Sequence, residues 1–186
     1  DVKGLAPKSN ITAWVDRKAF IHNLGHATAA YYGYYYYPGM TYMYEILDHA
    51  EVKDFTRSVM LQSADILLTA YPDDFTQSDL EEHIDDLINR FRNRALGDTI
   101  FRVGQDLQRK LSSDDRFMGA IHLGMQYGKP YNLILKAMSY GFVFTAKDES
   151  GKSLPADIDF RKSAETDLWK TLTEMLGFDP VNDLSV

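Results

Sequence analysis

Three polar side chains that can take part in proton transfer occur close together in one segment: Lys18, Asn23 and His26. On an α-helix with about 100° per residue, Asn23 falls near 140° and His26 near 80° around the axis from Lys18, so all three can face one cleft. A desolvated lysine exchanges protons near neutral pH, and an amide and an imidazole N–H can stabilise a developing oxyanion. The triplet therefore suits proton transfer at a hydroxyl group. An ordinary helix that carries the same residue types is the alternative.

The same segment also has the spacing of a helical zinc site, because His22 and His26 lie four residues apart. In the zincin pattern a glutamate follows the first histidine as the general base, whereas Asn23 follows His22 here and cannot accept a proton. No metal-ligand spacing relates the remaining histidines, which are His49, His83 and His122. We therefore expect no metal, and we expect His22 to be a packed or surface helix residue.

The composition predicts a single domain and excludes several classes of partner. The chain has 186 residues, of which 45% are hydrophobic, enough to build a core. It has no cysteine, which excludes disulfides and thiolate sites. A net charge of −7 argues against a broad nucleic-acid footprint. No apolar run of about 18 residues and no signal pattern are visible, so we expect a cytoplasmic protein without a membrane partner.

Helical periodicity runs through most of the sequence, and alternating strand patterns are scarce, so the predicted fold class is mostly α. Residues 1–15 contain glycine, proline and serine and are predicted to be an inter-domain connecting segment that leads into a helical domain over 16–186. Asp16 is the expected N-cap of the first helix, and Ser78 and Glu81 have the spacing of a capping box. Residues 147–159 read as a polar loop. The predicted helices are 17–37, 41–49, 51–71, 78–94, 98–111, 112–128, 129–144 and 165–176.

Two separated motifs in this order resemble the C-terminal domain of the polyol-specific long-chain dehydrogenase/reductase family, the mannitol dehydrogenase family. The first is K-x4-N-x2-H with its continuation NLGHATAAYYGY, and the second is RFRNRALGDTIFRVGQDLQRKL followed by DDRFMGAI. The similarity is clear up to about Phe144 and weaker beyond. It implies a multi-helical domain of the 6-phosphogluconate-dehydrogenase-like C-terminal type. No G-x-G occurs in the chain, so the Rossmann domain that precedes this one in the family is expected to be absent from it.

The resemblance assigns roles to residues of both motifs. Lys18 takes the place of the family's general acid/base, Asn23 holds the developing oxyanion, and His26 binds the substrate's oxygens. Two cations eight residues apart contact the polyol chain or its phosphate, and a neighbouring arginine adds charge; these are Arg102, Lys110 and Arg109. For these three cations, a solvated basic helix end is the alternative. His22 receives no role.

The family is NAD-dependent, so the resemblance implies NAD as the cofactor, bound mainly by the absent N-terminal Rossmann domain. The favoured reaction interconverts D-mannitol 1-phosphate and D-fructose 6-phosphate without a metal, and the chain alone is expected to be inactive. Within the same class, the alternatives are an unphosphorylated polyol such as mannitol and a hexuronate such as tagaturonate or fructuronate. In another class, the chain is a helical interaction module without chemistry. The choice between NAD and NADP lies outside this sequence.

Overall fold

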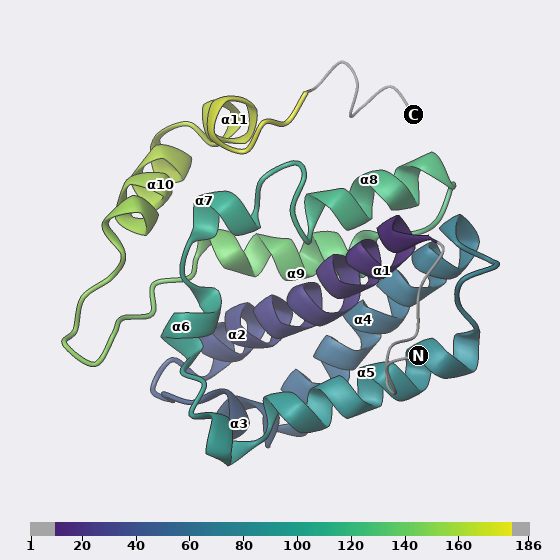
Figure 1. Ribbon diagram of the computed structural model, residues 1–186. Coiled ribbons are helices and arrows are strands. Elements are labelled where there is room, and N and C mark those ends of the chain that lie inside the picture. The colour runs from purple at the N-terminus through teal and green to yellow at the C-terminus, as the bar shows by residue number, and fades with distance from the viewer. Residues whose placement is uncertain (1–9, 180–186) are drawn as a thin grey trace, which may run out of the picture.

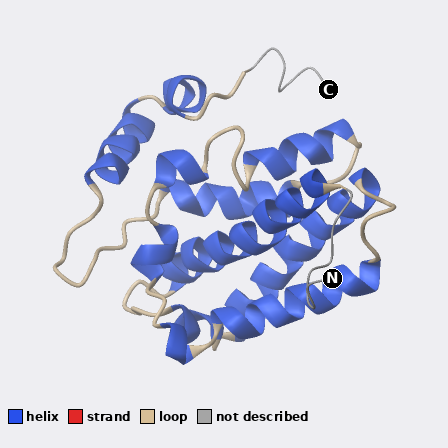
Figure 2. Cartoon of the chain, viewed as in Figure 1, coloured by secondary structure: helices blue, strands red, loops and turns tan. Residues whose placement is uncertain are grey.

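The computed structural model describes residues 10–179, and within this range the chain is helical and has no strand (Figures 1 and 2). An isolated backbone bridge joins Tyr42 to Thr99. The prediction of a mostly α fold is therefore confirmed. No helix in this part of the chain has the length and apolar character that spanning a membrane requires. The predicted connecting segment falls mainly on residues 1–9, outside the described range.

One continuous helical rod runs through the middle of the molecule and carries the first motif (Figure 1). It consists of α1 (Ile11–Arg17), the π-helical η1 (Lys18–Asn23) and α2 (Leu24–Tyr36). The rod begins earlier than predicted, because the side chain of Asn10, not Asp16, caps it by accepting a hydrogen bond from Ala13 N at 3.4 Å. Asp16 lies inside α1, where it accepts a hydrogen bond from the Tyr71 hydroxyl.

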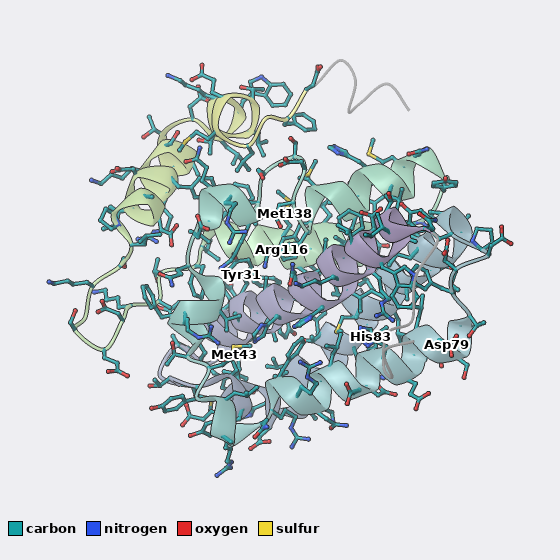
Figure 3. All side chains as sticks on the ribbon, viewed as in Figure 1. Tyr31, Met43, Asp79, His83, Arg116 and Met138 are labelled. Atoms are coloured by element: carbon teal, nitrogen blue, oxygen red, sulfur yellow. The ribbon has the colours of Figure 1, made fainter. Side chains whose placement is uncertain are left out.

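The α2 helix is apolar on most of its surface, which is typical of a helix surrounded by others. Gly25 and Gly33 permit this close packing, since a Cβ at either position would overlap the side chain of Met60 or Ile46. Tyr31 is fully buried and donates a hydrogen bond from its hydroxyl to Gly104 O at 3.1 Å (Figure 3). The neighbouring Tyr35 and Tyr36 remain exposed, so the tyrosines of residues 31–37 are divided between the core and the surface.

The helices that surround the rod come from the middle of the sequence. They are α3 (Met43–Leu47), α4 (Ala50–Ala70), α5 (Gln77–Phe91), the short 3-10 helix η2 (Arg94–Leu96), α6 (Ile100–Gly104), α7 (Leu107–Lys110), α8 (Met118–Gln126) and α9 (Asn132–Phe142). The predicted Ser78 capping box is wrong by two residues, because Thr76 is the cap and its hydroxyl accepts from Asp79 N at 3.2 Å. The helical period of the sequence places Leu80, Ile84 and Leu87 on one face of α5, and this face is buried.

The single helix predicted over 98–111 is broken into α6 and α7, which is a correction to the sequence-based prediction. Asp106 adopts a left-handed conformation with φ of 70°, which ends the helical path after Gly104. Its backbone N–H and that of Leu107 donate to the buried carboxylate of Asp157, at 3.0 and 2.7 Å. A residue about fifty positions downstream thus satisfies the donors that the break exposes.

The C-terminal part folds back over the bundle as α10 (Pro155–Thr166), α11 (Leu168–Lys170) and the π-helical η3 (Thr171–Met175) (Figure 1). The polar loop predicted for 147–159 was too long, because α10 already begins at Pro155. A proline suits the first position of a helix, and Phe160 of this helix is fully buried. Helix α10 brings Asp157 to the break between α6 and α7.

Candidate active site

The first motif lies at an irregularity of the central rod, because Lys18 opens the π-helical segment η1 and Asn23 closes it. The backbone N–H of Leu24 donates to Ala19 O, five residues back. A π turn contains one residue more than an α turn, and such turns are frequent at functional sites. The angle of about 140° expected from α-helical geometry is therefore too large, and the π turn brings Asn23 round toward the side of Lys18.

The three residues of the motif differ in their exposure. Lys18 is exposed, whereas Asn23 and His26 are half-buried. The side chain of Lys18 is thus open to solvent in this chain. To act as a general acid/base, Lys18 would have to be shielded from water by a substrate, a cofactor or another domain.

His26 is partly exposed, but the Nε2 end of its ring is buried. Its ring stacks on Phe91, with centroids 4.4 Å apart and planes 8° apart. Its Nε2 atom is buried, has no hydrogen-bond partner among the described residues, and lies 3.6 Å from Oδ2 of Asp98. Burial, together with the positive charges of its neighbours, lowers the pKa of His26 to about 3. The imidazole is therefore neutral in the physiological range and can exchange hydrogen bonds without carrying charge.

Two of the predicted cations of the second motif, Arg102 and Lys110, lie near His26, so the fold brings the two motifs together. Arg102, Lys110 and Arg116 all disfavour the protonated form of His26 electrostatically. Arg102 is exposed and forms an ion pair with Asp98, the same carboxylate that faces His26. Asp98 was missed in the sequence, although its i, i+4 spacing from Arg102 is the signal of a helical ion pair.

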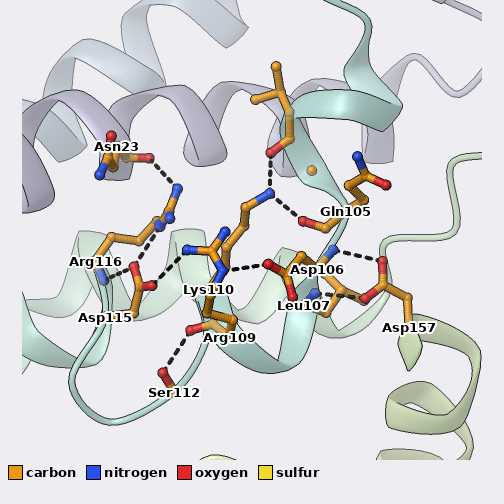
Figure 4. Close-up of polar contacts among 12 residues, drawn as sticks. Asn23, Gln105, Asp106, Leu107, Arg109, Lys110, Ser112, Asp115, Arg116 and Asp157 are labelled. Atoms are coloured by element: carbon orange, nitrogen blue, oxygen red, sulfur yellow. Dashed lines mark hydrogen bonds and ion pairs between the residues drawn. The ribbon is translucent and has the colours of Figure 1, made fainter. Parts of the chain in front are cut away.

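Lys110 is placed differently from Arg102, because its side chain is only 6% exposed. Its ammonium donates to Val103 O at 2.8 Å and to Gln105 O, two carbonyls at the end of α6 (Figure 4). Burial lowers the pKa of Lys110 to about 8, and the charges of Arg116 and Arg109 act in the same direction. In this conformation Lys110 holds the break between α6 and α7.

The third predicted cation, Arg109, lies on the surface of α7. It is 56% exposed and forms ion pairs with Asp106 and, at 3.3 Å, with Asp115 (Figure 4). Its guanidinium can leave these partners at small cost, because exposed ion pairs contribute little. Arg102 and Arg109 are thus accessible to a ligand, whereas Lys110 is not in this conformation.

Arg116 joins the two motifs, and the sequence-based assignment gave it no role. It is buried, donates from Nε to Asp115 at 2.8 Å and reaches the backbone carbonyl of Asn23 at 3.4 Å (Figure 4). Its charge also lowers the pKa values of His22 and His26. An arginine that follows two aspartates at the start of an apolar helix is the sequence signal that could have identified it.

His22 lies among positive charges. Burial lowers its pKa, and Arg90, Lys18 and Arg116 contribute in that order. Its ring centroid lies 6.3 Å from that of His26, and no group of three or more potential metal ligands occurs in residues 10–179.

A cleft with a volume of about 1450 Å³ lies between the end of α2, α6 and the loop after α9. Arg102 lines it together with Tyr34, Lys147 and Arg161, but Lys18, Asn23 and His26 do not. Arg102 therefore lies between this cleft and the environment of His26.

Comparison with known proteins identifies the family to which this chain belongs. The family model described as the mannitol dehydrogenase C-terminal domain matches residues 10–177. The chain belongs to this family. The described residues are thus almost entirely covered by the family's pattern, including α10 and α11, where the sequence resemblance had been weaker.

Curated relatives carry the name mannitol-1-phosphate 5-dehydrogenase. The protein from Aspergillus fumigatus is 30% identical over 185 residues, covering 100% of this chain and 44% of the relative. The protein from Podospora anserina is 28% identical over 186 residues, or 99% of this chain and 45% of the relative. The protein from Bacillus subtilis is 34% identical over 118 residues, or 63% of this chain and 31% of the relative. The chain thus spans less than half the length of the curated relatives that it matches.

Proposed function

We propose that the chain is the substrate-side domain of an NAD-dependent oxidoreductase that interconverts D-mannitol 1-phosphate and D-fructose 6-phosphate. The observation that carries this proposal is the meeting of the two motifs, in which the helix of Lys18, Asn23 and His26 lies beside the cations of the second motif. The names of the curated relatives support the choice of substrate.

Lys18 is the proposed general acid/base. In polyol oxidation its neutral amine accepts the hydroxyl proton, and in ketone reduction its ammonium returns that proton to the oxygen. Lys18 is exposed here, so this role requires that bound substrate and the remainder of the enzyme exclude water from it.

Asn23 and His26 are proposed to bind the reacting oxygen and its neighbours. The Asn23 amide lies at the end of the π segment and can donate to an alkoxide, which favours the charge that develops at the carbonyl oxygen. A neutral His26 can donate or accept one hydrogen bond. Because Nε2 of His26 is buried, this contact requires the side chains around it to move apart when substrate binds.

Arg102 and Arg109 are the proposed anchors of the phosphate, because both guanidiniums are exposed and pair with carboxylates that a phosphate could replace. An arginine fork matches the geometry of a phosphate and can exchange a carboxylate for it. We propose that Lys110 acts on the substrate without touching it. Its positive charge contributes to the electrostatic potential at the site, and its hydrogen bonds fix the break between α6 and α7. Its buried contacts with carbonyls support this role better than direct contact.

The nicotinamide of NAD, when bound, would supply the acceptor for the hydride that leaves the substrate carbon. Residues 10–179 contain no strand followed by a glycine-rich turn and a helix, the unit that holds a dinucleotide pyrophosphate. We therefore place cofactor binding in a domain outside this chain, and we expect the chain alone to be inactive.

The test uses a protein in which this chain is joined to its nicotinamide-binding domain. NADH consumption is followed with D-fructose 6-phosphate and with D-fructose, in the wild type, in Lys18→Ala and in Lys162→Ala, which alters an exposed lysine on α10. We expect turnover of the phosphorylated sugar, a loss of about 10²–10⁴-fold in kcat for Lys18→Ala, and no change for Lys162→Ala.

The outcomes separate the alternatives. Equal turnover of fructose and its phosphate would favour an unphosphorylated polyol as the substrate. Full activity of Lys18→Ala would remove the lysine from the mechanism, and no turnover of any sugar with either nicotinamide would favour an interaction module.

A further inference from the structure

The π-helical segment between Lys18 and Asn23 is held from outside by a residue of another helix. In a regular α-helix the N–H of Leu24 would donate to the carbonyl of Phe20. Here the N–H of Leu24 donates to Ala19 O and Ile21 O instead, so the Phe20 carbonyl loses its usual partner. This carbonyl is buried with its residue, and an unsatisfied buried carbonyl is unfavourable.

Ser63 of α4 supplies the replacement. Its hydroxyl donates to Phe20 O at 2.6 Å, and the side chain is fully buried. The aromatic ring of Phe20 is seated where Gly119 of α8 leaves room, since a Cβ at Gly119 would lie 2.7 Å from Phe20 Cε1. Two neighbouring helices thus accommodate the residue at the centre of the π segment.

We propose that Ser63 is a positioning residue for the acid/base lysine, acting through the Phe20 carbonyl. The inference rests on the function proposed above. If the π turn relaxed toward α geometry, Lys18 would rotate relative to Asn23 and His26, by up to about 100° for a shift of one residue. The hydroxyl of Ser63 favours the irregular geometry because it satisfies the carbonyl that this geometry leaves unpaired.

The experiment measures kcat and KM for D-fructose 6-phosphate in the enzyme joined to its nicotinamide-binding domain. Ser63→Ala is expected to lower kcat by about ten- to a hundred-fold, the scale of a small misplacement of a catalytic group. KM should stay unchanged, because the proposed phosphate anchors Arg102 and Arg109 lie on other elements. Ser63→Cys keeps a similar volume and a weak donor, so its kcat should lie between those of the wild type and Ser63→Ala. This variant also tests the proposal if Ser63→Ala does not fold.

Two matched controls lie on the same helix. Thr56→Val removes a buried hydroxyl that has no hydrogen-bond partner among the described residues. Ser58→Ala removes an exposed hydroxyl that donates to Asp54 O within its own helix. Both variants should keep the kcat of the wild type.

A double-mutant cycle with Lys18→Ala tests whether Ser63 acts through the lysine. If it does, Ser63→Ala should lower kcat in the presence of Lys18 but should have no further effect on the residual activity of Lys18→Ala. Equal losses in both backgrounds, or wild-type kcat in both Ser63 variants, would overturn the inference while leaving the proposed function intact. An unaffected Lys18→Ala single variant would instead overturn the proposed function.

Discussion

The Nε2 atom of His26 lies 3.6 Å from Oδ2 of Asp98, and the same carboxylate pairs with Arg102. Because His26 is neutral at physiological pH, this contact is not an ion pair there. Asp98 instead connects the one exposed cation of α6 to a buried imidazole. A ligand anion that draws Arg102 away would leave the carboxylate to His26 alone.

The buried imidazole of His26 should make the folded protein sensitive to acid. Its pKa is lowered from 6.5 to about 3 in the folded state, so between these values the unfolded chain binds the proton more readily. The stability that follows from a neutral His26 is fully present above pH 6.5 and is lost as the pH falls toward 3. Between pH 7 and pH 5 the wild type should lose about 2 kcal/mol more unfolding free energy than His26→Gln.

Urea unfolding of the two proteins at both pH values measures this difference. Glutamine can still form hydrogen bonds but does not titrate, so the comparison isolates the proton of the imidazole. Identical losses on acidification would show that the pKa of His26 is not lowered in the folded state.

The neighbours Lys110 and Arg109 should contribute to stability very differently. Lys110→Met removes the donor of two carbonyls at the end of α6 and should lower the unfolding free energy by about 1–3 kcal/mol. Arg109→Met removes only exposed ion pairs and should change it by less than about 1 kcal/mol. Thermal unfolding of both variants measures the contrast, and a larger effect at Arg109 would contradict the structural role of Lys110.

Asp157 should stabilise the fold because it accepts hydrogen bonds from the backbone at the break between α6 and α7. Its buried carboxylate accepts hydrogen bonds from the backbone of Asp106 and Leu107, so Asp157→Ala leaves two donors unpaired. We expect a loss of about 3 kcal/mol in unfolding free energy. Asp159→Ala, an exposed position of the same helix, should be nearly neutral. Equal chemical denaturation midpoints for the two variants would exclude this role.

Much of the fold could be predicted because it depends on patterns within single segments. The face of α5 that carries Leu80 and Ile84 is buried as its periodicity predicts. The break between α6 and α7 could not be predicted, because the donors that it exposes are satisfied by Asp157, which lies far along the chain. The helix propensities of the residues around the break contain no information about a hydrogen-bond acceptor so far along the chain.

The candidate site divides in the same way. Residue types and spacing singled out the lysine, asparagine and histidine, whereas the cations of the second motif were implied by the resemblance to the family. The roles of all these residues remain proposals. The spacing could not predict that Lys110 is buried while Arg109 is exposed, because this difference depends on the break. Nor could it predict the π segment, since its residues are ordinary helix formers and Ser63 lies on another helix.

The π segment also changes how the spacing between Lys18 and Asn23 translates into three dimensions. The segment absorbs one residue that an α-helix would not contain, so a pair five apart in the sequence is placed much as a pair four apart on a regular helix. A chain one residue shorter within 19–22 could run as an unbroken α-helix with α1 and α2 still docked. An alignment gap at this point would therefore be compatible with an unchanged site.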